Sequence, residues 1–458
     1  MIVTNSSLVV TGSFSQGFNL FAGSATLESG SIRILEDGDV TDATVLFRVG
    51  RTNAATLTIN GGVIEAGTML VGDTLSPLLE AQGTVRITGG LVALSSDLSI
   101  GDGITGAGLI EVLGGQLRVA NNQTNITRVG NDGVGQMRVS SAAAILGDTS
   151  VARHDGSRGT LTVETNGLVQ FSDDLSIGRF SGATGAVFVA GGQLVVLDHS
   201  IWVGREGMGQ LIVSNGLVQA RQLNVAAVPT NTASGTASFF GGSMILSSNL
   251  VIGSEANSFA QMSITGGGIN VTNPSGSAAV EIISGTLTQS GGATAADNLL
   301  ITHSPGHYIF NAGTLRTKGS VVSNGLPFVV GDGKNAATLE LLGGIHSFAN
   351  GLVVSSNATL KGCGTIIGSI TNHGTIATNC GSTGPARPSI TRVTRNGNTV
   401  SISFTTVTNV SYTVQYQDSL TDTNWTDLAT TAGGNGNIMT VDDLSATAAK
   451  RFYRVRGE

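Results

Sequence analysis

The sequence predicts an all-β protein: a three-faced parallel β-helix (β-solenoid) followed by a small β-sandwich. The first observation is a unit that recurs about every 25 residues, made of a strand, a Gly-Gly or Asn-Gly turn and two further strands. A fixed period of this length is typical of solenoids. The second is a two-residue alternation of apolar side chains with no helical stripe, which indicates β-structure. The third is the loss of the repeat after residue 387, where short strands and turn signals follow at the spacing of a sandwich.

Residues 1–47 hold the weakest copies of the repeat, SLVVTGSF and GSATLESGSIRIL. Terminal repeats of a solenoid are usually atypical, because an end coil must cover an apolar cross-section. We therefore predict N-terminal capping coils over 1–47. The opening MIVTNSSLVVTGSF lacks the positive region and continuous apolar core of a signal peptide. Either such a signal was removed before this numbering begins, which we favour, or export uses another route.

Residues 48–381 are predicted to form the β-helix itself. Regular coils such as TVRITGGLVALSSDLSIG, which begins at Thr84, carry three strands each. Alternate Leu, Ile and Val side chains, Leu98 and Ile177 among them, are expected to point inward and stack on the same positions of the neighbouring coils. The turn recurs in coil after coil, with its second residue at Gly62, Gly90, Gly115, Ser141, Gly167, Gly192, Gly216, Gly242 and Gly267.

The last part of the chain has a different character. Residues 382–387 are typical of a linker, and 388–458 contain strand-like segments such as VSYTVQYQDSL and KRFYRVRG between turn signals. We predict a separate small β-sandwich over 388–458, with Trp425 in its core.

Composition excludes several classes of function. Charged residues make up 12% of the 458 residues and the net charge is −7, with no basic cluster. This balance argues against nucleic acid or an anionic membrane as a partner. No apolar run reaches the roughly 18 residues of a transmembrane helix, so we predict no transmembrane segment.

Two segments carry a resemblance to known families. The strand-turn-strand-VG coil and the step GTIIGSITNHGTI, from Gly364, resemble the autotransporter-associated β-strand repeat and the β-helical passenger domains of Gram-negative surface proteins, over residues 48–381. YTVQYQDSLTDTNWTDL and RFYRVR are similar to fibronectin type III-like modules of large secreted bacterial proteins. The resemblance implies a location outside the cell or on the surface of a Gram-negative-type bacterium. It implies no activity, because passenger domains include adhesins, proteases and inert stalks.

An acidic row is expected at one corner of the solenoid. Asp73, Asp102 and Asp132 follow the third strands of successive coils, which lie about 4.8 Å apart. Stacked carboxylates repel one another unless a cation such as Ca²⁺ lies between them. The alternative, which we favour, is that these residues bond their own backbone at turns, since the GGxGxDxUx calcium repeat is absent.

Catalytic chemistry has one weak candidate region. Polysaccharide lyases and glycosidases need paired carboxylates gathered on one face, and the nearest approach is the group Asp148, Asp173, Asp174, Asp198 and His199. We favour a solvated polar face there. His303 and His307 flank Pro305-Gly306, which rules out a helix, and no third ligand is nearby, so we predict no metal site. The sequence thus predicts a non-enzyme without catalytic residues or a cofactor.

Two further features point outside catalysis. Trp202, in SIWVG, is expected to point outward between two inward residues, which makes it a candidate platform for stacking a sugar. Cys363 and Cys380 lie in the last short coils, where a disulfide would span neighbouring strands and secure the coil that frays first.

The functional expectation is a secreted structural subunit that builds an extracellular filament or surface assembly by head-to-tail self-contact. Residues 1–47 would form the main contact and would meet the sandwich or the last coils of a neighbouring copy. The alternative is a monomeric surface adhesin or glycan-binding stalk. A polysaccharide lyase or glycosidase ranks third.

Overall fold

A computed structural model gives the structure of the chain, which divides into two compact units, Met1–Thr378 and Asn379–Glu458. The residues that it describes are 1–11, 17–35, 46–74, 79–120, 126–229, 233–254, 258–377, 388–406, 411–419, 424–431, 434, 437–448 and 450–457. The predicted linker at 382–387 lies outside these residues.

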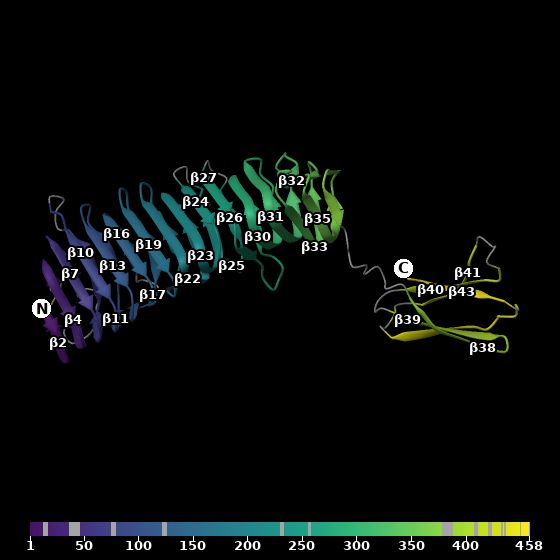
Figure 1. Cartoon of the computed structure of the whole chain (residues 1–458), viewed down its shortest axis with the longest axis horizontal. Helices are drawn as coiled ribbons and strands as arrows, with labels where there is room; N and C mark the ends of the chain where they lie inside the picture. Colours follow the sequence, from purple (N-terminus) through teal and green to yellow (C-terminus); the bar gives the residue numbers. More distant parts are fainter. Residues whose placement is uncertain are drawn as a thin grey trace. The chain divides into compact units, whose positions relative to one another are not determined.

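The first unit is a parallel β-solenoid, as predicted (Figure 1). Its described residues form one 37-stranded sheet in which all the pairings are parallel, and no described residue is helical. Between the two end coils, each strand pairs with a strand of the previous coil and with one of the next, so the chain winds around three faces.

Most strands belong to a single face. The first face holds β1 (Ile2–Val3), β4 (Gly23–Leu27), β7 (Ala54–Ile59), β10 (Gln82–Ile87), β13 (Ala107–Val112), β16 (Val134–Val139), β19 (Arg158–Glu164), β24 (Ser234–Phe239), β27 (Phe259–Ile264), β32 (Phe328–Val330), β34 (Leu352–Val354) and β36 (Ile370–Asn372). The second face holds β2 (Ser6–Thr11), β5 (Gly30–Leu35), β8 (Val63–Ala66), β11 (Leu91–Leu94), β14 (Gln116–Val119), β17 (Ala143–Leu146), β20 (Leu168–Phe171), β25 (Ser243–Leu246), β28 (Gly268–Val271) and β37 (Thr375–Ala377). The third face holds β3 (Phe18–Leu20), β6 (Leu46–Val49), β9 (Thr68–Asp73), β12 (Leu98–Asp102), β15 (Ile126–Val129), β18 (Asp148–Val151), β21 (Leu175–Ile177), β26 (Leu250–Ile252) and β29 (Ala279–Ile282).

Six longer strands bend around the corners between faces. All three faces are crossed by β22 (Thr184–Val203), β23 (Met208–Val225), β30 (Gly285–Ile301) and β31 (Gly306–Val322). The second and third faces share β33 (Ala337–Phe348) and β35 (Ala358–Ile367).

A residue-to-residue register within each face produces the core. Val85 of β10 lies between Leu57 of the coil before and Ile110 of the coil after, and all three side chains are fully buried. Leu98 and Ile177 are also fully buried, which confirms the predicted inward positions. Burial of such side chains contributes about 1.5–3 kcal/mol each, so this apolar column is the main source of stability.

The recurring glycine turn separates the first face from the second. Gly90 has a φ of 75°, and a Cβ there would lie 2.3 Å from the carbonyl oxygen of Gly62 in the coil before. Only glycine accepts both the positive φ and this close backbone approach. The repeat visible in the sequence is therefore set by how closely the turns stack.

The second unit contains two three-stranded antiparallel sheets. One consists of β38 (Ile390–Asn396), β39 (Thr399–Thr405) and β42 (Ile438–Asp443), and the other of β41 (Thr426–Thr431), β40 (Tyr412–Gln417) and β43 (Phe452–Gly457). Phe404 of the first sheet packs against Tyr412 of the second, with ring centroids 5.7 Å apart. The two sheets share one core, as a sandwich requires.

One expectation for this unit is wrong. Trp425 is half-buried and lies outside the apolar core, with the guanidinium of Arg454 4.4 Å from its ring centroid. The Arg454 guanidinium is charged and needs solvent, so a ring that packs against it lies at the edge of the core.

The inward register generates the first testable prediction. Ile177→Asp should lower the free energy of unfolding by about 3–5 kcal/mol, because an unpaired carboxylate would enter the dry core. Ile245→Asp is the matched control, since Ile245 points outward from β25 and is 39% exposed. Thermal unfolding followed by circular dichroism measures both. An unchanged melting temperature in Ile177→Asp would contradict the inward register.

Candidate functional site

The predicted acidic row lies at the end of the third face. Asp73 of β9 and Asp102 of β12 are direct register partners, so their side chains project from neighbouring coils. Nε of Arg48 lies 2.9 Å from Oδ2 of Asp73, and Nε of Arg51 lies 3.8 Å from the same oxygen. The protein itself therefore supplies the positive charge beside the first carboxylate.

The other two carboxylates of the row share an amide. Nδ2 of Asn131 donates to Oδ1 of Asp102 and to Oδ2 of Asp132, at 2.7 Å in both cases. Nδ1 of His154 lies 2.9 Å from Oδ1 of Asp132. Burial raises the pKa of Asp102. These contacts are with side chains, whereas the interpretation we favoured was hydrogen bonding to the residues' own backbone. That interpretation and calcium binding both stay predictions.

Another set of carboxylates joins consecutive coils at the start of the third face. Asp97 accepts a hydrogen bond from the backbone N–H of Ile126 at 2.9 Å and another from Nη1 of Arg128 at 2.9 Å. Asp174 repeats this arrangement with the backbone N–H of Ser200 at 2.9 Å and Nε1 of Trp202 at 3.0 Å. In each case one carboxylate satisfies a backbone donor and a side-chain donor of the next coil.

Arginines from successive corners fold back over the third face. Ser150 and Ser176 occupy outward positions of their strands, yet both are fully buried. Nη1 of Arg179 donates to Ser150 at 3.1 Å, and Nη1 of Arg205 donates to Ser176 at 3.3 Å. This cover was not predicted, because strand alternation alone assigns these serines to the solvent.

Trp202 points outward as predicted, since Ile201 and Val203 on either side are fully buried. Its ring is half-buried, and the guanidinium of Arg205 lies 5.2 Å from the ring centroid. Its indole N–H is already bonded to Asp174. A sugar that stacked on the covered side of the ring would have to displace Arg205, and the glycan-stacking role stays a prediction.

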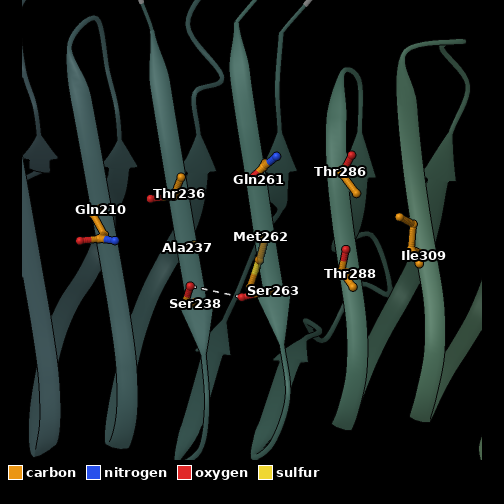
Figure 2. Close-up of a pocket in the computed structure, with 10 residues that line it drawn as sticks. All are labelled: Gln210, Thr236, Ala237, Ser238, Gln261, Met262, Ser263, Thr286, Thr288 and Ile309. Atoms are coloured by element: carbon orange, nitrogen blue, oxygen red, sulfur yellow. Dashed lines mark hydrogen bonds between the residues drawn. The ribbon is translucent and has the colours of Figure 1, made fainter. Parts of the chain in front are cut away.

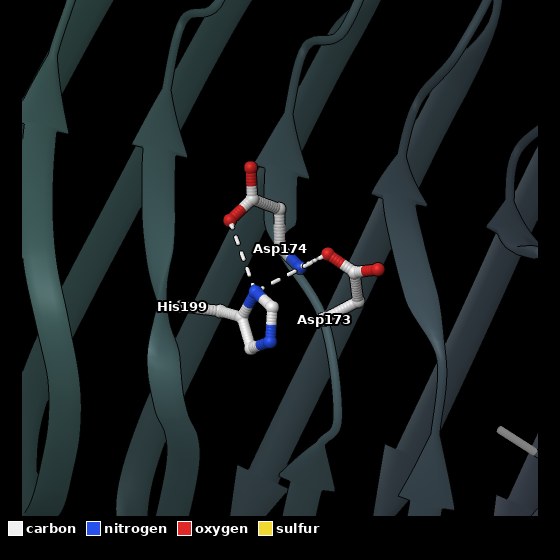
Figure 3. Close-up of side chains that lie close together, drawn as sticks. All are labelled: Asp173, Asp174 and His199. Atoms are coloured by element: carbon white, nitrogen blue, oxygen red, sulfur yellow. Dashed lines mark hydrogen bonds and ion pairs between the residues drawn. The ribbon is translucent and has the colours of Figure 1, made fainter. Parts of the chain in front are cut away.

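The candidate carboxylate region brings three side chains together (Figure 3). The imidazole of His199 faces both neighbouring carboxylates: Nδ1 lies 3.3 Å from Oδ1 of Asp173 and 3.9 Å from Oδ1 of Asp174. One ligand atom from each residue lies within 4.8 Å of the others, a spacing that would suit a metal ion. Both oxygens of Asp174, however, already accept hydrogen bonds from the next coil, so an ion would compete with a structural joint.

The remaining predicted residues do not join this cluster. Oδ2 of Asp148 lies 2.8 Å from Nη1 of Arg179. Asp198 is exposed, and its backbone φ is 60°. His303 lies in an exposed turn and its Nδ1 contacts Thr302, while His307 follows on β31.

Cys363 is half-buried in β35, and Cys380 lies outside the described residues, so the Cys363–Cys380 bridge stays a prediction.

A polar groove of about 560 Å³ lies on the first face (Figure 2). Its outward side chains form two rows across successive strands. One row is Gln210, Thr236, Gln261 and Thr286, and the other is Ser238, Ser263, Thr288 and Ile309. Sequence analysis missed the groove. The only signal for the groove in the sequence was a change from bulky to small side chains at one outward position of the first strand of each coil.

Comparison with protein-family models, curated proteins and solved structures finds no match to this chain. No helix in the described residues is long and apolar enough to cross a membrane.

Removal of divalent cations should leave the solenoid intact. The carboxylates of the acidic row already have protein partners, so we expect the melting temperature to be the same with and without a chelator. Thermal unfolding in EDTA, with added calcium as the comparison, measures this. A melting temperature that falls in EDTA and returns with calcium would show that the row binds the ion.

The Asp174 joint can be separated from a metal site by two variants. Asp174→Ala should lower the free energy of unfolding by about 1–3 kcal/mol, because it leaves the N–H groups of Ser200 and Trp202 without their acceptor. Asp173→Ala should cost less than about 1 kcal/mol, since Asp173 is more exposed and accepts one local hydrogen bond. Chemical unfolding followed by tryptophan fluorescence measures both. Equal losses that disappear in EDTA would indicate a shared ion instead.

Proposed function

We propose that this chain is a non-enzymatic structural subunit whose solenoids stack head to tail into a filament. The observation that carries the proposal is that the apolar core is covered along its length and open at its two end coils. Along the length, inward residues are almost completely buried. At the two end coils, side chains at the equivalent inward positions are partly exposed.

The first coil shows this opening clearly. On its second and third faces the inward side chains are only partly buried, while their partners one coil further along are buried almost completely; on the first face Val3 is buried. The four pairs are Leu8 and Ile32, Val10 and Ile34, Phe18 and Phe47, and Leu20 and Val49. Within the described residues, β1, β2 and β3 each pair with another strand on one side only.

The last coil of the solenoid has the same character. Leu352 and Leu360 are buried, and their register partners one coil further, Ile370 and Ile376, are 42% and 39% exposed. Within the described residues, β36 and β37 also pair on one side only. Unpaired strand edges beside exposed apolar side chains favour association with another edge.

The two open coils match one another. Both present parallel strands around the same apolar cross-section, so the first coil of one copy would continue the ladder that the last coil of another leaves open. Such a heterologous contact does not close on itself and produces a filament. Because the first coil offers one edge of the ladder and the last described coil offers the other, the partner in this proposal is a second copy of the chain.

The remaining observations support a structural role outside the cell. The carboxylates that enzymes of this shape would need are engaged in joints between coils, as at Asp97 and Asp174. The resemblance to autotransporter passenger domains and fibronectin type III-like modules supports a location outside a Gram-negative-type bacterium or on its surface. A second candidate function, a monomeric adhesin or glycan-binding stalk, is favoured by the groove of Figure 2.

Charge placed on the open last coil tests the proposal. Ile370→Lys combined with Ile376→Lys should weaken end-to-end association at least tenfold, because two ammonium groups would enter the apolar contact. Sedimentation velocity over a concentration series, with electron microscopy of the same samples, measures the association. The matched control is Ile245→Lys, which places the same charge on a lateral face.

The wild type is expected to form linear assemblies, and the control should form them equally well. A wild type that stays monomeric at every concentration would contradict the proposal. A double variant that assembles like the wild type would place the contact elsewhere.

A further inference from the structure

We propose that the groove on the first face binds a linear, uncharged polysaccharide that lies along the axis of the solenoid. The inference does not rest on filament formation, since the groove lies on a lateral face away from the end coils. It concerns a different surface from Trp202, which lies on the third face.

The depth of the groove comes from the size of the side chains at one outward position, which recurs in the first-face strand of each coil. Ile212, Ser238, Ser263, Thr288 and Ile309 succeed one another there, so three small hydroxyl residues lie between two isoleucines. The resulting hollow has a volume of about 560 Å³, within the range of about 300–1,000 Å³ that is usual for ligand sites. Ile309 is 46% exposed and forms an apolar wall at one end.

The lining offers donors and acceptors that the protein leaves unused. The one hydrogen bond between lining side chains joins Ser263 to Ser238, at 3.2 Å. In the described part of the chain, Gln210, Thr236 and Gln261 make no side-chain hydrogen bond to a protein group. Hydroxyl and amide groups both donate and accept, which matches the hydroxyl groups of sugars.

The absence of charge in the lining sets the class of sugar. None of the ten residues that line the groove carries a charge. An acidic polysaccharide would place its carboxylates or sulfates opposite hydroxyl and amide groups without a compensating cation, which is unfavourable where water is partly excluded. A neutral polymer meets no such cost.

The arrangement of the groove favours a polymer over a compact ligand. Its residues come from five successive strands of the first face, β23, β24, β27, β30 and β31, which lie about 4.8 Å apart. A second hollow of about 220 Å³ shares Gln210 and Thr236 with the first and extends toward β22. Similar polar groups therefore recur along the axis, and a ligand with regularly spaced hydroxyls engages several coils at once. Affinity should then rise with chain length.

Binding of defined neutral polysaccharides by the full chain tests the inference. The probes are mannan, xyloglucan, mixed-linkage β-glucan and dextran in affinity electrophoresis, with polygalacturonate and alginate as acidic counterparts. Trisaccharides and hexasaccharides of the polymer that binds are then compared by titration calorimetry. We expect at least one neutral polymer to bind, and its hexasaccharide to bind at least tenfold more tightly than its trisaccharide.

Two groove variants and one control connect this binding to the site. Gln210→Ala with Gln261→Ala should weaken binding at least tenfold, and Ser263→Tyr, which fills the floor, should abolish it. Thr58→Ala with Thr162→Ala is the control, because these residues point outward from the same face away from the groove. Melting temperatures of all variants check that they are folded.

Several outcomes would overturn the inference. These are no binding of any neutral probe, a preference for the acidic polymers, or binding that survives both groove variants. Loss of binding in Trp202→Ala with the groove variants unaffected would place the sugar site on the third face. The Ile370→Lys/Ile376→Lys variant should still bind the polymer, so failure of the filament proposal and failure of this one are distinguishable.

Discussion

The parallel register between successive coils is the constraint on which the rest of this structure depends. Once Leu57, Val85 and Ile110 stack in one column, the other positions of the same strands stack as well, inward and outward. The inward columns become a continuous apolar core, and the glycine column keeps the turns close enough for pairing to continue. A change at a single residue therefore acts on two neighbouring coils and seldom on distant ones.

The same register explains where functional surfaces can arise. An outward column is a row of side chains at fixed spacing, so its chemistry is set by the run of residues at one position of the repeat. A run of small hydroxyl residues makes the groove at Ser238 and Ser263. A carboxylate in one coil and a hydrogen-bond donor in the next make the contact between Asp174 and Trp202. In the first and last coils that the structure describes, the strands pair on one side only, and Leu8 and Ile376 remain partly exposed.

Much of the fold was predictable from the sequence, because inward position follows from alternation alone. Leu98 and Ile177 are examples, and the turn at Gly90 follows from the repeat. Side-chain cover was not predictable, because it depends on long residues that reach across coils: Arg205 covers Trp202, and Arg454 keeps Trp425 out of the sandwich core. The groove was missed for a related reason, since its depth exists only relative to Ile212 and Ile309 in other coils.

Fibre diffraction from aligned wild-type assemblies tests most directly whether copies of this chain continue one another's parallel ladder. Continued stacking of coils predicts a reflection at about 4.8 Å along the filament axis, because the strands run perpendicular to that axis throughout. Assemblies whose 4.8 Å reflection lies across the filament axis would show that the solenoids associate side by side, and would contradict the account.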